Sequence, residues 1–440
     1  MNAQFVAAAY SYSIFVCTSG EVQAVGNNIA GQLANGTTVS TYIPVQASGL
    51  TDIIAVAGGE LHSIYLKNNG TVWVVGRNNF GQLGDGTNVD KINPVQLPGL
   101  VEIIRVAAGR EHSLFLKNDG TVWAVGRNNS GQLGDGTVVS KNTPVQVLGL
   151  TGITAIDAGW NHSLFLKNDG TVRAVGQNSY GNLGDGTGFS KSTPVQVLGL
   201  TGITRLSGGW NHSLFVKNDG TAWAVGRNQS GELGDGTNIL KTIPVQVTGG
   251  LTGITSVSAG GDHSLFLKND GTVWASGFNQ YGALGNGTLV SASTPIQVNA
   301  ITGITAVSAG YDHSLFLKNN GSVFATGVNY WGQLGDGTNV SKSTPVQVTD
   351  LCSLSLKTPE NSIENNISIY PNPCNAELFI ELDAYQNTTV EILNIQGQSL
   401  QISSLQTFKT SFLLDRLTSG IYLIQIRSPK GIVVKKIIKN

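Results

Sequence analysis

Residues 107–147 read AAGREHSLFLKNDGTVWAVGRNNSGQLGDGTVVSKNTPVQV, and the local signals of this stretch are all of β type. Apolar and polar residues alternate only weakly from Ser113 to Lys117, as in a strand that is buried on both faces. Asn118-Asp119-Gly120 then supplies the positive φ of a tight hairpin turn. Thr121 to Val125 returns as a second strand, and Pro144 opens PVQV, which an outer or edge strand tolerates as its first residue. No segment shows helical periodicity. The stretch therefore predicts one unit of four short strands.

This unit of about fifty residues recurs seven times in the first four-fifths of the chain. All the histidines fall at one slot of the unit, and in the first copy that slot holds Tyr12. The histidines are His62, His112, His162, His212, His263 and His313. A period near fifty is typical of propeller blades rather than of helical repeats, so each unit is predicted to form one blade.

The units resemble the regulator of chromosome condensation (RCC1) repeat in three ordered pieces. These are Gly159-Trp160-Asn161-His162-Ser163, Asp169-Gly170-Thr171-Val172-Arg173 and Asn178-Ser179-Tyr180-Gly181-Asn182-Leu183-Gly184, with equivalents in the other units. The resemblance covers roughly residues 3–350 and implies a seven-bladed β-propeller closed into a ring. We therefore expect residues 1–350 to form an RCC1-like propeller.

The composition changes after residue 350. Residues 351–365 are polar and predict a linker, and residues 366–440 alternate as short strands split by turns, which predicts a small β-sandwich. The predicted fold class is therefore all-β, a seven-bladed propeller followed by a sandwich.

The last segment resembles the type A sorting domain of the Bacteroidetes type IX secretion system. The matching residues are Tyr370, Pro371, Asn372 and Pro373, then Gly420 to Leu423 with Gly420 and Tyr422, then the basic end with Lys435 and Lys436. The resemblance implies export across the outer membrane by the type IX machinery. It also implies a tail that is recognised and usually removed, and a propeller that is released or attached to the cell surface.

Such cargo first crosses the inner membrane on a signal peptide, yet MNAQFVAAAYSYS lacks a basic region followed by an apolar core. We therefore expect the true start to lie upstream. No stretch is long and apolar enough to predict a membrane span.

Charge and cysteine content narrow the function classes. Residues 1–350 carry 18 Lys+Arg against 20 Asp+Glu, and no basic patch or tail is visible, so nucleic acid is not expected as a partner. Cys352 and Cys374 flank the linker and are candidates for a pair, whereas three unpaired thiols are the favoured expectation, with Cys17 placed in a strand of the first blade.

The repeated polar residues suggest chemistry but are expected to be structural. No carboxylate accompanies every histidine at a fixed offset, so the preferred role is structural, with the side chain hydrogen-bonded to loop backbone within or between blades. The Gly-Asp-Gly-Thr loops offer one carboxylate each, too few for calcium, so turn capping is expected for Asp85, Asp135, Asp185, Asp235 and Asp336. No catalytic residue, metal site or cofactor is predicted.

A ligand site is expected where the copies differ. The position two residues before the histidine varies among the copies: it holds Tyr10, Glu60, Arg110, Trp160, Trp210, Gly261 and Tyr311. The two positions just ahead of the Gly-Gln-Leu loop also vary, and they hold Asn79-Phe80, Ser179-Tyr180, Gln280-Tyr281 and Tyr330-Trp331. The candidate ligand-binding residues are Tyr10, Arg110, Trp160, Tyr180, Trp210, Tyr281, Tyr311 and Trp331, since aromatic and arginine side chains anchor many interfaces. Packing between blades is the alternative for Trp160 and Trp210. The recurring Trp73, Trp123, Trp223 and Trp274 are expected in the core, and Gln23, Arg173 and Phe324 break that pattern.

The favoured function is a secreted or surface-bound, non-catalytic and monomeric module that binds a protein through one loop face. A carbohydrate-binding or adhesive protein is the alternative, with Trp160, Trp210 and Tyr311 as stacking platforms. An enzyme is disfavoured because no nucleophile elbow, paired carboxylates or metal cluster stands out. Nucleotide exchange, known among eukaryotic relatives, is not expected because the uniform unit spacing leaves no room for an inserted exchange hairpin.

Overall fold

The computed structural model describes residues 3–352, 367–382, 388–394, 398–428 and 431–440. The chain divides into two compact units, Met1–Ser353 and Leu354–Asn440. Most of the predicted linker, residues 353–365, lies outside the described residues.

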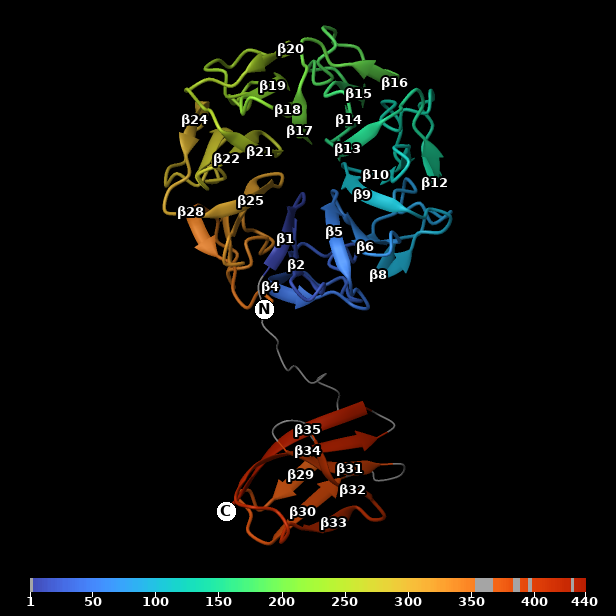
Figure 1. Ribbon diagram of the computed structural model, residues 1–440, viewed down its shortest axis with the longest axis vertical. Helices are drawn as coiled ribbons and strands as arrows, with labels where there is room; N and C mark the ends of the chain where they lie inside the picture. The colour runs from blue at the N-terminus through green and yellow to red at the C-terminus, as the bar shows by residue number, and fades with distance from the viewer. Residues whose placement is uncertain (1–2, 353–366, 383–387, 395–397, 429–430) are drawn as a thin grey trace. The chain divides into compact units, whose positions relative to one another are not determined.

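The first unit is a propeller of seven four-stranded antiparallel sheets arranged around a central channel (Figure 1). The first three blades are β1 (Ala3–Ala8), β2 (Tyr12–Cys17), β3 (Val22–Gly26) and β4 (Thr41–Gln46); β5 (Ile53–Gly58), β6 (His62–Lys67), β7 (Val72–Gly76) and β8 (Lys91–Gln96); and β9 (Ile103–Ala108), β10 (His112–Lys117), β11 (Val122–Gly126) and β12 (Lys141–Gln146). The fourth and fifth are β13 (Ile153–Ala158), β14 (His162–Lys167), β15 (Val172–Gly176) and β16 (Lys191–Gln196); and β17 (Ile203–Gly208), β18 (His212–Lys217), β19 (Ala222–Gly226) and β20 (Lys241–Gln246). The sixth and seventh are β21 (Ile254–Ala259), β22 (His263–Lys268), β23 (Val273–Gly277) and β24 (Ala292–Gln297); and β25 (Ile304–Ala309), β26 (His313–Lys318), β27 (Val323–Gly327) and β28 (Lys342–Gln347).

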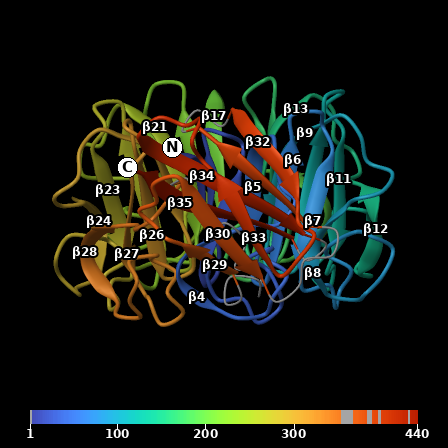
Figure 2. The same cartoon turned by 90° about the horizontal axis from the view of Figure 1, so that it is seen from below.

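Within each blade the strands follow one another from the channel outward, so the first strand lines the channel and the fourth lies on the periphery (Figure 1). Seen from the edge, strands such as β11 and β23 run from one face of the propeller to the other (Figure 2). The second strand is buried along almost its whole length, which explains the weak alternation of SLFLK. The hydrophobic clusters lie between blades, as where Leu114 and Val147 of the third blade pack with Ile156 and Phe165 of the fourth.

Two local predictions need correction. Pro144 is the fourth residue of β12 rather than the first of a strand, and the pairing of β12 with β11 is irregular there, so the missing N–H does not break a regular ladder. The recurring tryptophans pack against the hydrophobic clusters, as predicted, but they are half-buried rather than fully buried. Their outer side is open enough for a lysine to cover it, as where Lys67 Nζ lies 5.1 Å from the Trp73 ring centre.

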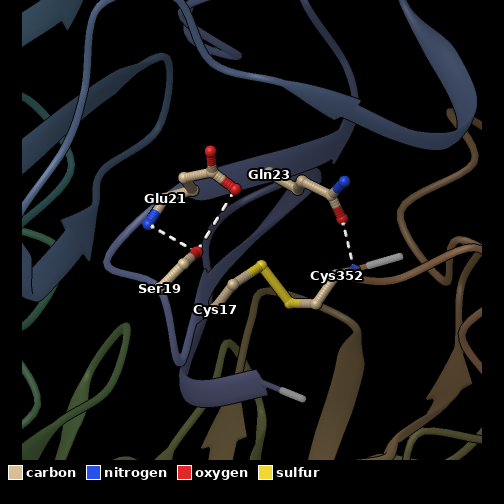
Figure 3. The surroundings of a disulfide bond; sticks show 5 residues. All are labelled: Cys17, Ser19, Glu21, Gln23 and Cys352. Atoms are coloured by element: carbon tan, nitrogen blue, oxygen red, sulfur yellow. Dashed lines mark hydrogen bonds between the residues drawn. A yellow bond between two sulfur atoms is a disulfide. The ribbon is translucent and has the colours of Figure 1, made fainter. Parts of the chain in front are cut away.

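The ring closes without exchange of a strand between the first and last blades, because each sheet is built from contiguous sequence. Instead, Cys17 at the end of β2 forms a disulfide with Cys352, just after the last blade (Figure 3). The prediction of unpaired thiols, and the alternative pairing of Cys352 with Cys374, are both wrong: Cys374 is a free, buried cysteine in the second unit. Gln23 replaces the usual tryptophan because its Oε1 accepts a hydrogen bond from the Cys352 N–H at 2.8 Å (Figure 3).

The second unit contains two antiparallel sheets. One has the order β29 (Ile367–Tyr370), β30 (Glu377–Leu382) and β33 (Lys409–Leu413), and the other has the order β32 (Ser399–Ser404), β31 (Thr389–Leu393), β34 (Gly420–Ser428) and β35 (Gly431–Lys439). A shared apolar core including Leu378, Ile392 and Ile424 joins them, so the fold class is the predicted propeller followed by a sandwich.

Candidate binding face of the propeller

The two faces of the propeller carry different loops. Because the strands of a blade are antiparallel, the connections from first to second strand and from third to fourth strand lie on one face, which we call the long-loop face. The Arg77 N–H donates to the Leu61 carbonyl and thereby joins these two connections in the second blade. The tight turns after the second strand lie on the opposite face, which we call the hairpin face. Every predicted ligand residue lies in a connection on the long-loop face.

The histidines form a belt of hydrogen bonds between blades. His162 Nε2 lies 3.0 Å from the Ser213 hydroxyl of the next blade, and that hydroxyl donates to the Asn182 carbonyl. Since the hydroxyl proton is used there, Nε2 is assigned as the proton donor of a neutral imidazole. The same contact recurs from each of the six histidines, and burial lowers their pKa values to about 3 or 4. The structural role expected for the histidines is confirmed, but the expected partner, loop backbone, is wrong: each imidazole meets a serine hydroxyl on the second strand of the next blade.

The position three residues before each histidine requires glycine for a steric reason. A Cβ added at Gly159 would lie 2.1 Å from His162 Cε1, because the imidazole packs directly against the glycine. In the first blade Ala9 stands at this slot together with Tyr12, whose hydroxyl donates to the His62 carbonyl and accepts from Ser63. Alanine and tyrosine therefore replace glycine and histidine as a pair.

The aspartates of the Gly-Asp-Gly-Thr loops cap turns, as predicted. Asp135 Oδ1 accepts from the Thr137 N–H at 2.9 Å and from Asn128 Nδ2 at 3.0 Å, and its carboxylate lies 3.7 Å from Lys141 Nζ. No group of three or more histidine, cysteine, aspartate or glutamate side chains in the described ranges is placed to hold a metal ion.

Four of the predicted aromatic residues meet at the centre of the long-loop face. Tyr10, Trp160, Trp210 and Tyr311 come from the first, fourth, fifth and seventh blades, and their ring centres lie 4.5 to 6.0 Å apart wherever the rings are in contact. The rings are tilted by 36 to 55°, so each covers part of its neighbours. These residues, the central cluster, contact one another both between adjacent blades, as Trp160 does with Trp210, and across the ring, as Tyr10 does with Trp160. The mutual contact leaves little free ring face for a stacked ligand.

Arg110 is also at the centre. Its guanidinium lies 4.6 Å from the Trp160 ring centre, and its Nε donates to Glu60 Oε2 at 3.0 Å. An acid, an arginine and an aromatic ring from three successive blades thus satisfy one another.

The central channel contains a cavity of about 270 Å³, bordered by the seven first strands and the central cluster. Of its two carboxylates, Glu60 is paired with Arg110, whereas Asp157 accepts from the Gly208 N–H at 2.9 Å, and burial raises the pKa of Asp157 to about 6. Ser207, Ser258 and Ser308 likewise accept from the first strand of the next blade. The polar groups of the cavity wall are therefore used to join blades.

The other predicted residues lie nearer the rim. Tyr281 of the sixth blade contacts Tyr330 of the seventh, with ring centres 6.1 Å apart, and the exposed fractions of Tyr281, Tyr330 and Trp331 are 37%, 61% and 43%. We call these three residues the rim aromatics. Tyr180 is half-buried and makes none of the ring contacts found in the described residues. The structure thus brings Tyr10, Arg110, Trp160, Trp210 and Tyr311 together, places Tyr281 and Trp331 farther out, and leaves Tyr180 apart.

The sequence reasoning missed a ring of exposed apolar side chains on the same face. One slot of every blade carries such a residue, with exposed fractions of 58 to 76%: Val39, Val89, Val139, Phe189, Ile239, Val290 and Val340. Each carbonyl at this slot accepts from the buried asparagine eleven residues earlier, as from Asn28 Nδ2 to Val39, which fixes the loop. The sequence signal that could have revealed this ring is an apolar residue at the same position of every repeat.

The sorting landmarks meet in the second unit. Asn372 Nδ2 donates to the Lys436 carbonyl at 3.0 Å, and Asn372 Oδ1 accepts from the Ile438 N–H at 2.9 Å, so the Tyr-Pro-Asn-Pro segment is attached to β35. Gly420 pairs with Lys439, and the buried Tyr422 pairs with Ile437 across β34 and β35. No helix in the described part of the chain is long and apolar enough to cross a bilayer.

Comparison with known proteins gives consistent matches. A model of the RCC1-like domain matches residues 94–358, more than half of the chain, and models of the regulator of chromosome condensation (RCC1) repeat match residues 19–66, 69–116 and 53–82. A model of the secretion system C-terminal sorting domain matches residues 368–440. No curated protein sequence matches the chain.

Two solved structures show the same propeller fold. Human WBSCR16 superposes with a TM-score of 0.69 at 22% identity, covering 75% of this chain and 94% of that protein. Prp20p from Saccharomyces cerevisiae superposes with a TM-score of 0.68 at 22% identity, covering 84% of this chain and 90% of that protein. At this identity the likeness concerns the fold alone.

Proposed function

Since the chain belongs to the RCC1-like domain family and ends in a secretion system sorting domain, we propose that it is a secreted, non-catalytic protein that binds a protein partner through the long-loop face of its propeller. The sorting domain indicates secretion to the cell surface or beyond. The binding role and the choice of face are the steps that we add.

The observation that carries the proposal is the gathering of exposed aromatic and apolar side chains on the long-loop face. The rim aromatics and the seven-membered apolar ring are all on this face, held by hydrogen-bonded loops. Tyrosine and tryptophan are enriched at the anchor points of protein interfaces, and rigid presentation lowers the entropic cost of binding.

The arrangement of the central cluster favours a protein over a sugar at the centre of the face. A stacked sugar needs a free aromatic face, whereas the rings of Trp160 and Trp210 are turned toward each other with centres 5.1 Å apart. Asn161, a candidate amide for a sugar hydroxyl, already donates to Gln177 Oε1 at 3.0 Å.

The test is a comparison of three immobilised full-length proteins exposed to extracellular and cell-envelope proteins of the source cells. One is unaltered, one carries Tyr281→Ser, Tyr330→Ser and Trp331→Ser, and a control carries Val101→Ser, an exposed apolar residue beside the hairpin turn of the third blade. We expect a protein retained by the unaltered chain and the control but lost from the rim variant. Equal retention by all three would reject the long-loop face, and retention of glycans alone would establish the carbohydrate-binding alternative.

A further inference from the structure

On the long-loop face, the residue before each histidine slot lies beside the first residue after the third strand of the same blade. In the third blade these are Glu111 and Arg127, whose carboxylate and guanidinium are 2.7 Å apart. In the fourth they are Asn161 and Gln177, whose amides are hydrogen-bonded. In these two blades the two slots form a polar pair.

The seventh blade lacks this pair. The Val328 N–H donates to the Asp312 carbonyl at 2.8 Å, so Val328 occupies the partner slot and offers no polar side chain. In the sixth blade Phe278 occupies the same slot, but there Asp262 is paired with Arg227 from the fifth blade. No hydrogen bond or ion pair reaches the Asp312 side chain from any described residue. Asp312 is therefore a carboxylate whose counterion is missing.

The surroundings of Asp312 make this absence costly. Asp312 is half-buried, and burial raises its pKa to about 6, so the carboxylate still carries a charge in neutral solution. The arginines on this face do not neutralise it: Arg110 is paired with Glu60 and Arg227 with Asp262, and neither forms an ion pair with Asp312. A partly buried carboxylate without an ion pair destabilises the folded protein, and a cation from a binding partner would remove this destabilisation.

Aromatic rings continue outward from this carboxylate. Val328, whose N–H donates to the Asp312 carbonyl, lies two residues before Tyr330, and Tyr330 contacts Tyr281 of the sixth blade. The aliphatic stem of a lysine or arginine packs well on such rings, and its charged head is attracted to their faces.

The same chain contains a completed version of this arrangement. Across the second to fourth blades, Glu60 binds Arg110, and Arg110 lies over Trp160. Across the sixth and seventh blades the acid and the aromatic rings are present, but Arg227 is paired with Asp262, and no arginine of the described residues forms an ion pair with Asp312.

We propose that the seventh blade receives a basic side chain, arginine or lysine, from the protein partner, with Asp312 as its counterion and the rim aromatics packed along its stem. This inference rests on the proposed function, since it places the partner on the long-loop face. It adds the chemistry that the partner must present.

The test uses the full chain labelled with 5-fluorotryptophan, so that the fluorine resonance of Trp331 reports on the rim. The resonance is assigned with Trp331→Phe. The probes are two acetylated and amidated peptides, Ala-Leu-Arg-Leu-Ala and the same peptide with citrulline in place of arginine, because citrulline keeps the shape of arginine and removes the charge. We expect the arginine peptide to shift the Trp331 resonance and to bind about tenfold more tightly than the citrulline peptide.

Two variants complete the test. Asp312→Asn keeps the shape of the side chain, and the fold accepts asparagine at this slot in Asn161 and Asn211. Asp219→Asn removes the same charge from an exposed turn on the hairpin face. We expect Asp312→Asn to bind the arginine peptide only as weakly as the citrulline peptide, and Asp219→Asn to bind it as the unaltered chain does.

Equal affinity for both peptides, unchanged affinity in Asp312→Asn, or no shift of the Trp331 resonance with either peptide would each overturn the inference. Equal affinity with a shift at Trp331 would leave the proposed face intact while removing the role of charge. The proposed function fails separately, if the partner is still retained by the variant that lacks the rim aromatics.

Discussion

His313 Nε2 in the last blade lies 3.0 Å from the hydroxyl of Ser13 in the first blade, although 300 residues separate them in the chain. This contact completes a belt in which a histidine or tyrosine of each blade meets a serine of the next. Because no strand is exchanged between the ends of the ring, the belt, the apolar cluster between the two terminal blades and the Cys17–Cys352 disulfide together hold the ring closed.

Removing one serine of the belt should destabilise the propeller. In Ser213→Ala the His162 Nε2–H loses its acceptor and the Asn182 carbonyl loses its donor, both in a buried site. We expect the free energy of unfolding, measured in urea, to fall by about 1–3 kcal/mol. Ser179→Ala, in an exposed position, is the matched control and should change it by less than about 0.5 kcal/mol.

The buried histidines should make the protein sensitive to acid. Their folded pKa values of about 3 to 4 lie below the usual 6.5, so between these limits the unfolded chain binds more protons and the free energy of unfolding falls as pH is lowered. Asp157 and Asp312, with pKa values raised to about 6, act in the opposite direction. Because the six histidines outnumber these two carboxylates, we expect the free energy of unfolding to fall as the pH is lowered from 6 to 4, measured by denaturation at several pH values.

A control for the acid effect is contained in the first blade. The variant Gly159→Ala with His162→Tyr copies the Ala9 and Tyr12 pair of the first blade into the fourth blade and removes one titrating group. Ala9 packs against Gly58 of the second blade, and Gly208 of the fifth blade leaves the same room beside residue 159. The slope should fall by about 1.4 kcal/mol per pH unit. An unchanged slope would show that His162 does not cause the acid sensitivity.

Loss of the disulfide should open the ring more easily. The bond joins residues separated by 335 positions, so its removal releases a very long loop in the unfolded state. We expect Cys17→Ser with Cys352→Ser to lower the free energy of unfolding by roughly 2–5 kcal/mol. A reducing agent should have the same effect on the unaltered chain and none on the variant. Equal stability of both proteins under oxidising conditions would contradict the role of the disulfide in closure.

The unpaired carboxylate should reduce stability in neutral solution. The pKa of Asp312 is raised in the folded state, so its ionised form destabilises the fold as pH rises through about 6. Asp312→Asn should therefore have a higher thermal midpoint than the unaltered chain at pH 8 and a similar one at pH 4. Asp219→Asn should show no such gain at pH 8, since that carboxylate lies 3.5 Å from Lys217 Nζ and its pKa is lowered.

The attachment of the Tyr-Pro-Asn-Pro segment to β35 should matter for export. Asn372→Ala removes both side-chain hydrogen bonds to β35. We expect the variant to accumulate inside the cell envelope, measured by immunoblotting of culture medium, cell surface and periplasm. Asn394→Ala in the same unit provides the control, and normal export of Asn372→Ala would show that the landmarks act independently of this contact.

Much of the fold was predictable because the unit repeats. A single copy such as residues 107–147 contains the buried strand, the Asn-Asp-Gly turn and the glycines, and seven copies leave a ring of blades as the consistent arrangement. The six histidines were correctly expected to be structural. The Ser213 partner was not predictable, because it lies in a neighbouring blade at a distance that only ring geometry sets.

By itself the sequence determined the blade count, the strand order and the sorting tail, since these follow from local patterns repeated along the chain. Tertiary structure decided the pairing of Cys17 with Cys352, the meeting of Tyr10 with Trp160 and Trp210, and the isolation of Asp312. The physical reason is that closing a ring brings together side chains from distant units, and contacts across its centre depend on the positions of all seven blades at once.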